Sequence, residues 1–256
     1  MLTPILESTR ARLASLGLVV GELRSRAAST GPARPFAAAL EAPGLQVIAE
    51  IKRRSPSAGP IDLDLDAVAK AREYEAGGAA AISVLTEPDY FGGSLDDLVA
   101  VRRAVSLPVI RKDFTLDPVQ VWEGRAAGAD AILLIVAALG DADLARLLQE
   151  AHAAGVAALV EVHTEDEARR AVAAGATLIG VNNRDLATFR TDLATAERVA
   201  AALPERATLV AESGVADEEG AARMAAAGYD AILVGEALVR SGDPARLIAG
   251  LRAAGS

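Results

Sequence analysis

Lysine is scarce in this chain, and its positions point to acid–base chemistry. Of 26 Lys and Arg residues, only Lys52, Lys70 and Lys112 are lysines, and Lys52 and Lys112 each end an aliphatic run. Arginine keeps its proton, whereas a partly buried lysine can release and regain one. We therefore interpret these two residues as candidate general acids or bases. The alternative is that they only form ion pairs with Glu50 and Glu161.

Further polar residues lie near the ends of the same and later aliphatic runs. Glu50 lies two positions before Lys52, so both side chains point to one side of an extended strand. Glu161, Asn182 and Glu212 follow at three later runs. Carboxylates beside a lysine are suited to proton transfer. The amide of Asn182 would orient a ligand, unless this asparagine only forms a turn.

Small residues after the last two aliphatic runs predict an anion site. Ser213-Gly214 follows one run and Gly235 follows the next. Glycine permits close approach of the backbone, and backbone N–H groups at such turns often bind phosphate. Arg184 and Lys52 would lie within reach of this site. A single glycine after a strand would mean little, because turns require it anyway.

Apolar and histidine residues near these ends are less specific. Phe91, Phe114 and Leu186 are candidates to wall an aromatic substrate, although such residues also pack in cores. We expect His163 to be a loop residue and His152 to lie on a helix surface. Two histidines and no cysteine leave little material for a metal site, so we expect none.

A repeated pattern places these residues in the fold. An Ala-rich helical segment, a glycine and an aliphatic run recur along the chain. Glycine ends a helix well, and a continuous aliphatic run is typical of a strand buried on both faces. Eight strands are predicted, at residues 45–51, 80–85, 109–110, 132–138, 157–162, 178–181, 207–211 and 231–234.

Eight strands that alternate with eight helices predict an α/β protein with a (β/α)8 TIM barrel. The main alternative is a doubly wound open sheet, which rarely keeps eight units so even. We expect residues 1–44 to form an N-terminal helical extension with a loop at 29–35, and residues 45–256 to form a single barrel domain. The active site of such a barrel lies at the C-terminal ends of the strands, where the polar residues above would meet.

Composition narrows the functional classes. The chain has 256 residues, of which 52% are hydrophobic, and its net charge of −9 disfavours nucleic-acid binding. The longest apolar run near the start is too short to span a membrane. The absence of cysteine suits a reducing cytoplasm. We expect a cytoplasmic enzyme, a monomer or weak homodimer, that binds a small phosphorylated substrate.

Six ordered segments resemble the indole-3-glycerol phosphate synthase family of tryptophan biosynthesis. The resemblance covers about residues 47–239. The segments are EIKRRSPS (50–57), YFGGS (90–94), RKDF (111–114), EVH (161–163), NNRDL (182–186) and ESG (212–214). Six ordered motifs at predicted strand ends are far more specific than any one of them. Residues 1–44 match the family only loosely.

The resemblance implies a carboxy-lyase reaction without a cofactor. The family closes the ring of 1-(2-carboxyphenylamino)-1-deoxyribulose 5-phosphate, with loss of carbon dioxide and water, to give indole-3-glycerol phosphate. It implies that Lys112 protonates the developing alkoxide. Lys52, Glu161 and Glu50 would share the other proton transfers, in an order that the sequence leaves open.

The resemblance also implies how the substrate is held. Asn182 and Glu212 would orient the sugar or the catalytic groups. The anionic ends would be bound by Ser55, Arg184, Ser213, Gly214, Gly235 and the backbone N–H of Glu236. Phe91, Phe114 and Leu186 would enclose the anthranilate ring. Many relatives have a small residue where Glu236 stands, so we expect its carboxylate to point outward.

Three alternatives remain at this point. Phosphoribosylanthranilate isomerase is a related phosphosugar barrel, but its relatives use a cysteine base and this chain has no cysteine. A second alternative is a barrel that binds a ligand without turnover. A third is a barrel that accepts a different aryl-amino ketose phosphate. Activity measurements would separate the last two from the synthase.

Overall fold

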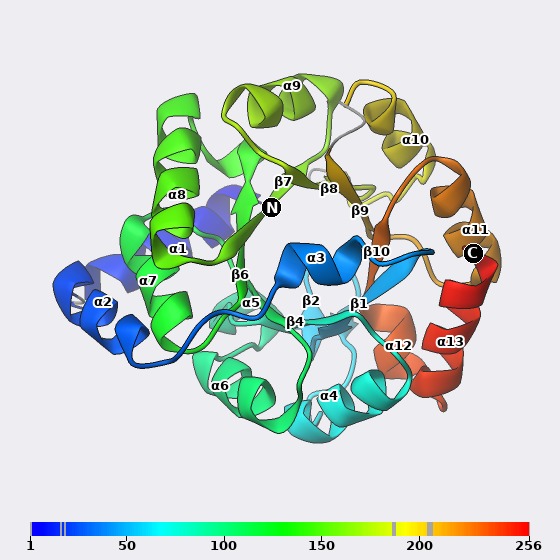
Figure 1. Cartoon of the computed structure of the whole chain (residues 1–256), viewed down its shortest axis with the longest axis horizontal. Helices are drawn as coiled ribbons and strands as arrows, with labels where there is room; N and C mark the ends of the chain where they lie inside the picture. Colours follow the sequence, from blue (N-terminus) through cyan, green and yellow to red (C-terminus); the bar gives the residue numbers. More distant parts are fainter. Residues whose placement is uncertain (1, 16, 18, 186–187, 204–206, 256) are drawn as a thin grey trace.

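Eight parallel strands close into a barrel in the computed structural model (Figure 1). The structure describes residues 2–15, 17, 19–185, 188–203 and 207–255. In order around the barrel, the strands are β1 (Gln46–Ile51), β4 (Ala81–Leu85), β5 (Val109–Lys112), β6 (Ala131–Ile135), β7 (Ala157–Val162), β8 (Leu178–Asn182), β9 (Thr208–Glu212) and β10 (Ala231–Val234). Since β10 pairs with β1, the sheet has no free edge. The predicted (β/α)8 barrel is confirmed.

A long helix follows each barrel strand and packs on the outside. These helices are α4 (Ala67–Ala76), α6 (Leu95–Ala104), α7 (Pro118–Ala126), α8 (Asp141–Ala154), α9 (Glu165–Ala173), α10 (Ala194–Ala200), α11 (Glu218–Ala226) and α13 (Pro244–Ala254). Two short helices, α5 (Pro88–Phe91) and α12 (Glu236–Arg240), precede α6 and α13. No helix in the described ranges is long and apolar enough to cross a membrane.

Local capping determines where these helices begin and end. Ser94, Thr164 and Asp217 each accept a hydrogen bond from the backbone N–H three residues later, as their position before acidic first turns predicts. At the end of α8, Gly155 adopts the left-handed conformation with φ of 68°. After α4 the left-handed residue is Gly78.

Apolar residues fill two layers, one between the barrel and its helices and one inside the barrel. Inward side chains such as Ile48, Ile110 and Leu159 pack inside the barrel. Phe36 and Leu40 of α3 (Phe36–Leu40) join this inner layer and close the N-terminal end of the barrel. The opposite end, where the strands finish, is left for the site.

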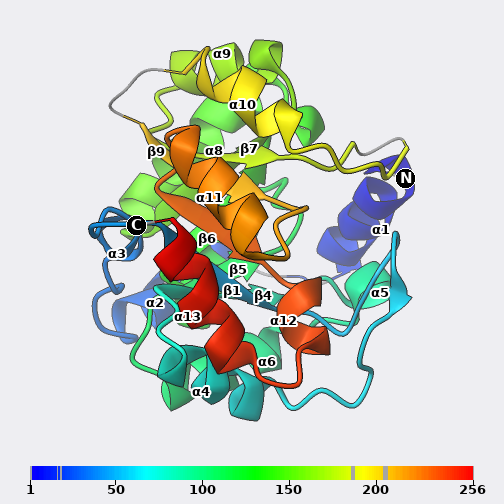
Figure 2. The ribbon, with the colours of Figure 1, turned by 90° about the vertical axis from the view of Figure 1, so that its right-hand side faces the viewer.

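The N-terminal helices reach both ends of the barrel. Figure 2 shows α1 (Leu2–Ser15) at one end and α3 at the other. Between them, α2 (Val20–Ala28) packs along α7, and the Arg24 guanidinium lies 4.7 Å from the centre of the Trp122 ring. The residues at 29–35 form a loop between α2 and α3. The expected helical extension is therefore present.

Two details differ from the sequence prediction. The fourth strand, predicted over 132–138, ends at Ile135 and continues as a short 3-10 helix, η1 (Val136–Ala138). An apolar run alone does not distinguish a strand from such a turn. The sequence also did not predict the two-stranded hairpin of β2 (Arg54–Ser55) and β3 (Gly59–Pro60), because two residues are too few to show strand periodicity.

Candidate active site

All eight strands contribute to one cavity, of about 440 Å³, at the C-terminal end of the barrel. Leu133 of β6 and Leu233 of β10 supply apolar surface from within the barrel. Leu2 and Ile5 of α1 line the same cavity, so the N-terminal helix covers part of the mouth. The cavity is thus a mostly apolar enclosure with polar side chains from neighbouring strands.

Lys112, at the end of β5, lies between two carboxylates. Its Nζ donates to Glu161 Oε2 at 2.9 Å and to Glu212 Oε2 at 2.8 Å. Asn182 Nδ2 donates to the other oxygen of Glu161 at 3.2 Å. These residues lie at or next to the last positions of β5, β7, β8 and β9, and they meet because parallel strands bring their C-terminal ends to one side of the barrel.

A second acid–base pair lies at the end of β1. Lys52 Nζ donates to Glu50 Oε1 at 2.6 Å, and Ser83 Oγ donates to Glu50 Oε2 at 3.2 Å. The two residues face the same side, as their spacing predicts. Lys52 and Lys112 therefore do form the ion pairs with Glu50 and Glu161 that were the alternative to an acid–base role. Ion pairing does not contradict acid–base chemistry, because a paired ammonium is already placed to pass its proton.

Burial and charge shift the pKa values of this cluster in different directions. Burial alone would lower the pKa of Lys112, but the neighbouring carboxylates, first that of Glu161, raise it. Burial would raise the pKa of Glu161, but Lys112 and then His163 lower it. Burial and repulsion from Glu161 raise the pKa of Glu212 to about 7, against the attraction of Lys112. The surroundings therefore favour the charged form of Glu161 and disfavour that of Glu212.

Two glycines leave room for the carboxylates. A Cβ on Gly180, in β8, would lie 2.1 Å from Glu212 Oε1. A Cβ on Gly235, after β10, would lie 2.7 Å from Glu50 Oε1. Gly235 was expected at an anion site, whereas Gly180 was not predicted. The signal for Gly180 was present, because a glycine inside an aliphatic strand marks a close approach.

The other predicted site residues lie at the same cavity, except Leu186, which is outside the described residues. They are Ser55, Phe91, Phe114, Arg184, Ser213, Gly214, Gly235 and Glu236. The rings of Phe91 and Phe114 have centroids 6.1 Å apart and make an apolar wall. The Glu236 carboxylate accepts a hydrogen bond from Arg240 Nε at 3.0 Å, and its side chain is 40% exposed.

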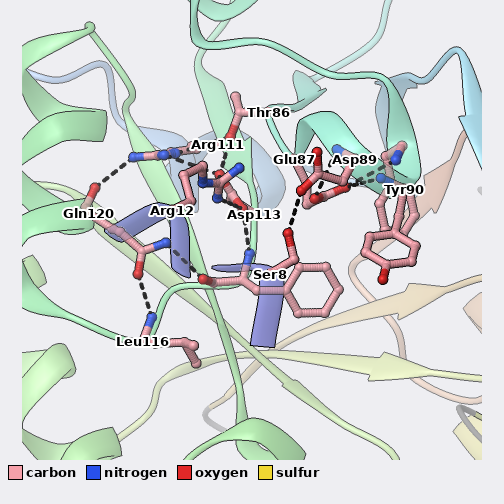
Figure 3. Close-up of polar contacts among 12 residues, drawn as sticks. Ser8, Arg12, Thr86, Glu87, Asp89, Tyr90, Arg111, Asp113, Leu116 and Gln120 are labelled. Carbon is pink, nitrogen blue, oxygen red and sulfur yellow. Dashed lines mark hydrogen bonds and ion pairs between the residues drawn. The ribbon is translucent and has the colours of Figure 1, made fainter. Parts of the chain in front are cut away.

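A buried network at the end of β5 ties α1 to the site (Figure 3). The Asp113 carboxylate accepts from Thr86 Oγ1 at 2.7 Å and from Arg111 at 3.1 Å. It also accepts from Arg12 of α1 at 3.0 Å. Burial would raise the pKa of Asp113, but Arg111 and then Arg12 hold it below its usual value. Because Asp113 directly follows Lys112, this ion pair joins the N-terminal helix to the strand that ends in Lys112.

A second polar contact joins α1 to α5 (Figure 3). Ser8 Oγ donates to the Asp89 carboxylate. Glu87 caps α5 by accepting from the backbone N–H groups of Tyr90 at 2.7 Å and Phe91 at 3.1 Å. Helix α1 therefore contacts the helix that carries part of the apolar wall. Sequence reasoning missed these contacts, because they join segments about 80 residues apart in the chain.

A family model described as "Indole-3-glycerol phosphate synthase" matches residues 2–251. The chain belongs to the indole-3-glycerol phosphate synthase family. The match begins in α1 and ends in α13, so it includes the extension as well as the barrel. The resemblance noted from six strand-end segments is confirmed.

Full-length relatives carry the same name. The indole-3-glycerol phosphate synthase of Mycobacterium ulcerans (strain Agy99) is 51% identical over 258 residues, which cover 100% of this chain and 95% of the relative. That of Rhodococcus opacus (strain B4) is 50% identical over 258 residues, which cover 100% of this chain and 96% of the relative. The agreement therefore extends over the whole length of the chain.

Solved structures at low identity show the fold. A 3-hexulose-6-phosphate synthase from Salmonella typhimurium aligns with a TM-score of 0.69 at 15% identity, covering 82% of this chain and 98% of that one. A thiamine phosphate pyrophosphorylase from Pyrococcus furiosus aligns with a TM-score of 0.63 at 19% identity, covering 82% and 95%. These likenesses support the barrel and do not bear on the indole-3-glycerol phosphate synthase chemistry.

In this indole-3-glycerol phosphate synthase family member, His163 lies in a loop as expected, and it also contacts the site. His163 follows β7, as a loop residue would, but its Nε2 lies 3.4 Å from Glu161 Oε1. Its spacing of two from Glu161 was the signal that both face the same side.

Within the described part of the chain, no three His, Cys, Asp or Glu side chains are grouped to hold a metal ion.

Proposed function

We propose that this cavity carries out the family's ring closure, with Lys112 as the general acid. The observation that supports this role is a buried ammonium held between two carboxylates of different protonation tendency. The ring carbon that bears the substrate carboxylate attacks the ketone carbon, and the C=O electron pair moves to oxygen. Lys112 would give that oxygen a proton, since its neighbours keep it charged until the alkoxide forms.

The later steps need one more acid and one base. The C–C bond to the carboxylate breaks, carbon dioxide leaves, and its electron pair restores the aromatic ring by neutralising the iminium nitrogen. The substrate therefore supplies its own electron sink. A proton must then reach the departing hydroxyl, and a base must remove a ring proton. We propose that the Lys52–Glu50 pair and Glu161 share these two transfers.

Binding of the two ends of the substrate follows the shape of the cavity. The Phe91 and Phe114 wall would pack against the anthranilate ring. We propose that the phosphate lies at Ser213-Gly214 and Gly235, with Arg184 supplying charge. Ser213 has φ of 62°, which non-glycine residues rarely adopt, so the turn after β9 is constrained at this position.

The decisive experiment mixes purified protein with 1-(2-carboxyphenylamino)-1-deoxyribulose 5-phosphate, without metal or cofactor, and follows indole fluorescence. We expect product from the natural chain and a loss of kcat by about 10² to 10⁴ in Lys112→Met. Lys70→Met is the matched control, because Lys70 lies on α4 and pairs with Glu73 outside the cavity. Tight binding without turnover would instead favour a ligand-binding barrel.

We further propose that the enzyme works in the cytoplasm as a monomer or weak homodimer. One chain supplies side chains to the cavity from all eight strands and from α1, which supports activity without a partner. We also propose that residues 1–44 are an extension of the single domain formed by 45–256. Kinetics across a dilution series, read beside sedimentation at the same concentrations, would test the oligomeric part.

A further inference from the structure

His163 is clamped between two carboxylates beside the catalytic cluster. Its Nε2 lies 3.4 Å from Glu161 Oε1, and its Nδ1 lies 3.1 Å from Glu167 Oε2. The same Glu167 oxygen accepts the His163 backbone N–H at 2.7 Å. The Glu167 backbone N–H is in turn bound by Thr164 Oγ1 at 3.2 Å, in the first turn of α9. The side chain of His163 is only 11% exposed, so water offers little alternative.

The positions of the two carboxylates favour the imidazolium form. A neutral imidazole has one N–H and one lone pair, so one of its nitrogens would present a lone pair to a carboxylate. The imidazolium donates to Glu167 from Nδ1 and places positive charge beside Glu161 at Nε2. Among the described residues, Nε2 is buried without a hydrogen-bond partner, so its attraction to Glu161 is that of an ion pair. Burial would lower the pKa of His163, but the hydrogen bond to Glu167 and the charge of Glu161 raise it.

We infer that protonated His163, held by Glu167, is a positioning residue that fixes which oxygen of Glu161 faces Lys112. The two Glu161 oxygens are then divided. Oε2 accepts from Lys112, while Oε1 faces Asn182 and His163. His163 is not among the residues that line the cavity. Its effect on the reaction therefore passes through Glu161, and the inference rests on the proposed role of that carboxylate.

The inference predicts a pH dependence with a definite sign. The titratable groups that face His163 are Glu161 of β7, Glu167 of α9 and Glu212 of β9, and Lys112 lies beyond Glu161. Loss of the imidazolium proton removes the positive charge that attracts Glu161 Oε1, so the carboxylate is held less firmly in its orientation toward Lys112. We expect kcat to fall on the alkaline side at the pH where His163 titrates, while KM changes little.

Nuclear magnetic resonance can follow this group directly, because the chain has two histidines. The variant His152→Gln assigns the two imidazole signals. We expect the His163 midpoint to lie above its ordinary value of 6.5, and Glu167→Gln to lower it. The alkaline limb of the pH profile of kcat should shift by the same number of pH units as the His163 midpoint. The matched control is Glu165→Gln, in the same first turn of α9 and exposed, which should move neither.

A second variant separates positioning from a structural role. His163→Gln keeps a hydrogen-bond donor but cannot titrate, so we expect kcat to fall about tenfold and the alkaline limb to lose this transition. A thermal melt matching that of His152→Gln would show that the fold is retained. A His163 midpoint at or below 6.5, or an alkaline limb that ignores Glu167→Gln, would overturn the inference.

Glu161→Gln distinguishes this failure from failure of the proposed function. If that variant keeps full activity, the catalytic role of Glu161 is wrong, and the inference falls with it. If it is inactive but the pH profiles of His163→Gln and Glu167→Gln match the natural chain, the proposed function stands and only the inference about His163 is wrong. A lower His163 midpoint in Glu161→Gln would support the inferred coupling.

Discussion

At the residue scale, the site works by giving similar groups different surroundings. Glu161 and Glu212 both bind the Lys112 ammonium, at 2.9 and 2.8 Å. Glu161 has a further donor in Asn182, whereas Glu212 Oε1 has no hydrogen-bond partner among the described residues. Two carboxylates that share one cation do not ionise equally, so the environment separates their protonation states. One cluster can therefore hold a carboxylate whose pKa is lowered, Glu161, beside one whose pKa is raised, Glu212.

The raised pKa of Glu212 predicts how stability depends on pH. Its ordinary value of 4.5 is raised to about 7 in the folded chain. The contribution of its bound proton to stability is full below the ordinary value and is lost as pH rises through about 7. We expect Glu212→Gln to lose less thermal stability than the natural chain between about pH 5 and about pH 8. Scanning calorimetry at these two pH values measures the difference. Glu219→Gln, exposed on α11, is the control.

The close approach of Gly180 to Glu212 leads to a second prediction. Gly180→Ala would place a methyl group where Glu212 Oε1 now lies, so the carboxylate must leave its position beside Lys112. We expect kcat to fall on the order of a hundredfold while the barrel stays folded. Gly242→Ala is the matched control, since its added Cβ would meet nothing within 4 Å. Unchanged kcat in Gly180→Ala would show that Glu212 is not needed in this position.

Residue types alone indicated much of this cluster. The scarcity of lysine singled out Lys52 and Lys112, and period-two spacing paired Glu50 with Lys52. Both features are local or compositional, so they can be read without coordinates. The second partner of Lys112 was not predicted, because it depends on the distance between strands that are 100 residues apart in sequence. The prediction that His163 lies in a loop is confirmed, but its contact with Glu167 on the following helix was not predicted.

At the element scale, α1 is held on the mouth by a few polar contacts. Arg12 binds Asp113, and Ser8 binds Asp89. We expect Arg12→Ala to raise KM about tenfold, because a hydrogen bond between charged groups is lost and α1 covers the cavity less of the time. The change in kcat should be smaller, since Arg111 still pairs with Asp113.

Hydrogen exchange along α1 checks the cause of that effect. Faster exchange over Leu2–Ser15 in Arg12→Ala, with unchanged exchange in the barrel strands, is the expected result. Arg10→Ala serves as the control, because Arg10 lies exposed on the same helix. If KM rises while exchange of α1 stays the same, the Arg12–Asp113 pair acts on the site without holding the helix.

At the scale of the whole molecule, the barrel was readable because its units repeat. A buried aliphatic run followed by a helix occurs eight times, and most of these helices begin at a side chain that caps them. The path of the extension was not readable from sequence. The places of its helices depend on contacts such as Arg24 with Trp122 and Arg34 with Asp130. Such contacts leave no periodic pattern.

The single tryptophan allows docking of the extension on the barrel to be measured. Trp122 of α7 touches Arg24 of α2, so its fluorescence reports whether the extension is docked. Far-ultraviolet circular dichroism reports total helix, most of which lies in the barrel. Because the extension contacts the mouth, the side and the base, we expect its urea transition to fall no earlier than that of the barrel. Arg34→Ala removes guanidinium hydrogen bonds to Leu107 and Arg102 backbone oxygens, and should bring the fluorescence transition forward. An early fluorescence transition in the natural chain would mean that the extension undocks on its own, against the proposal of one domain.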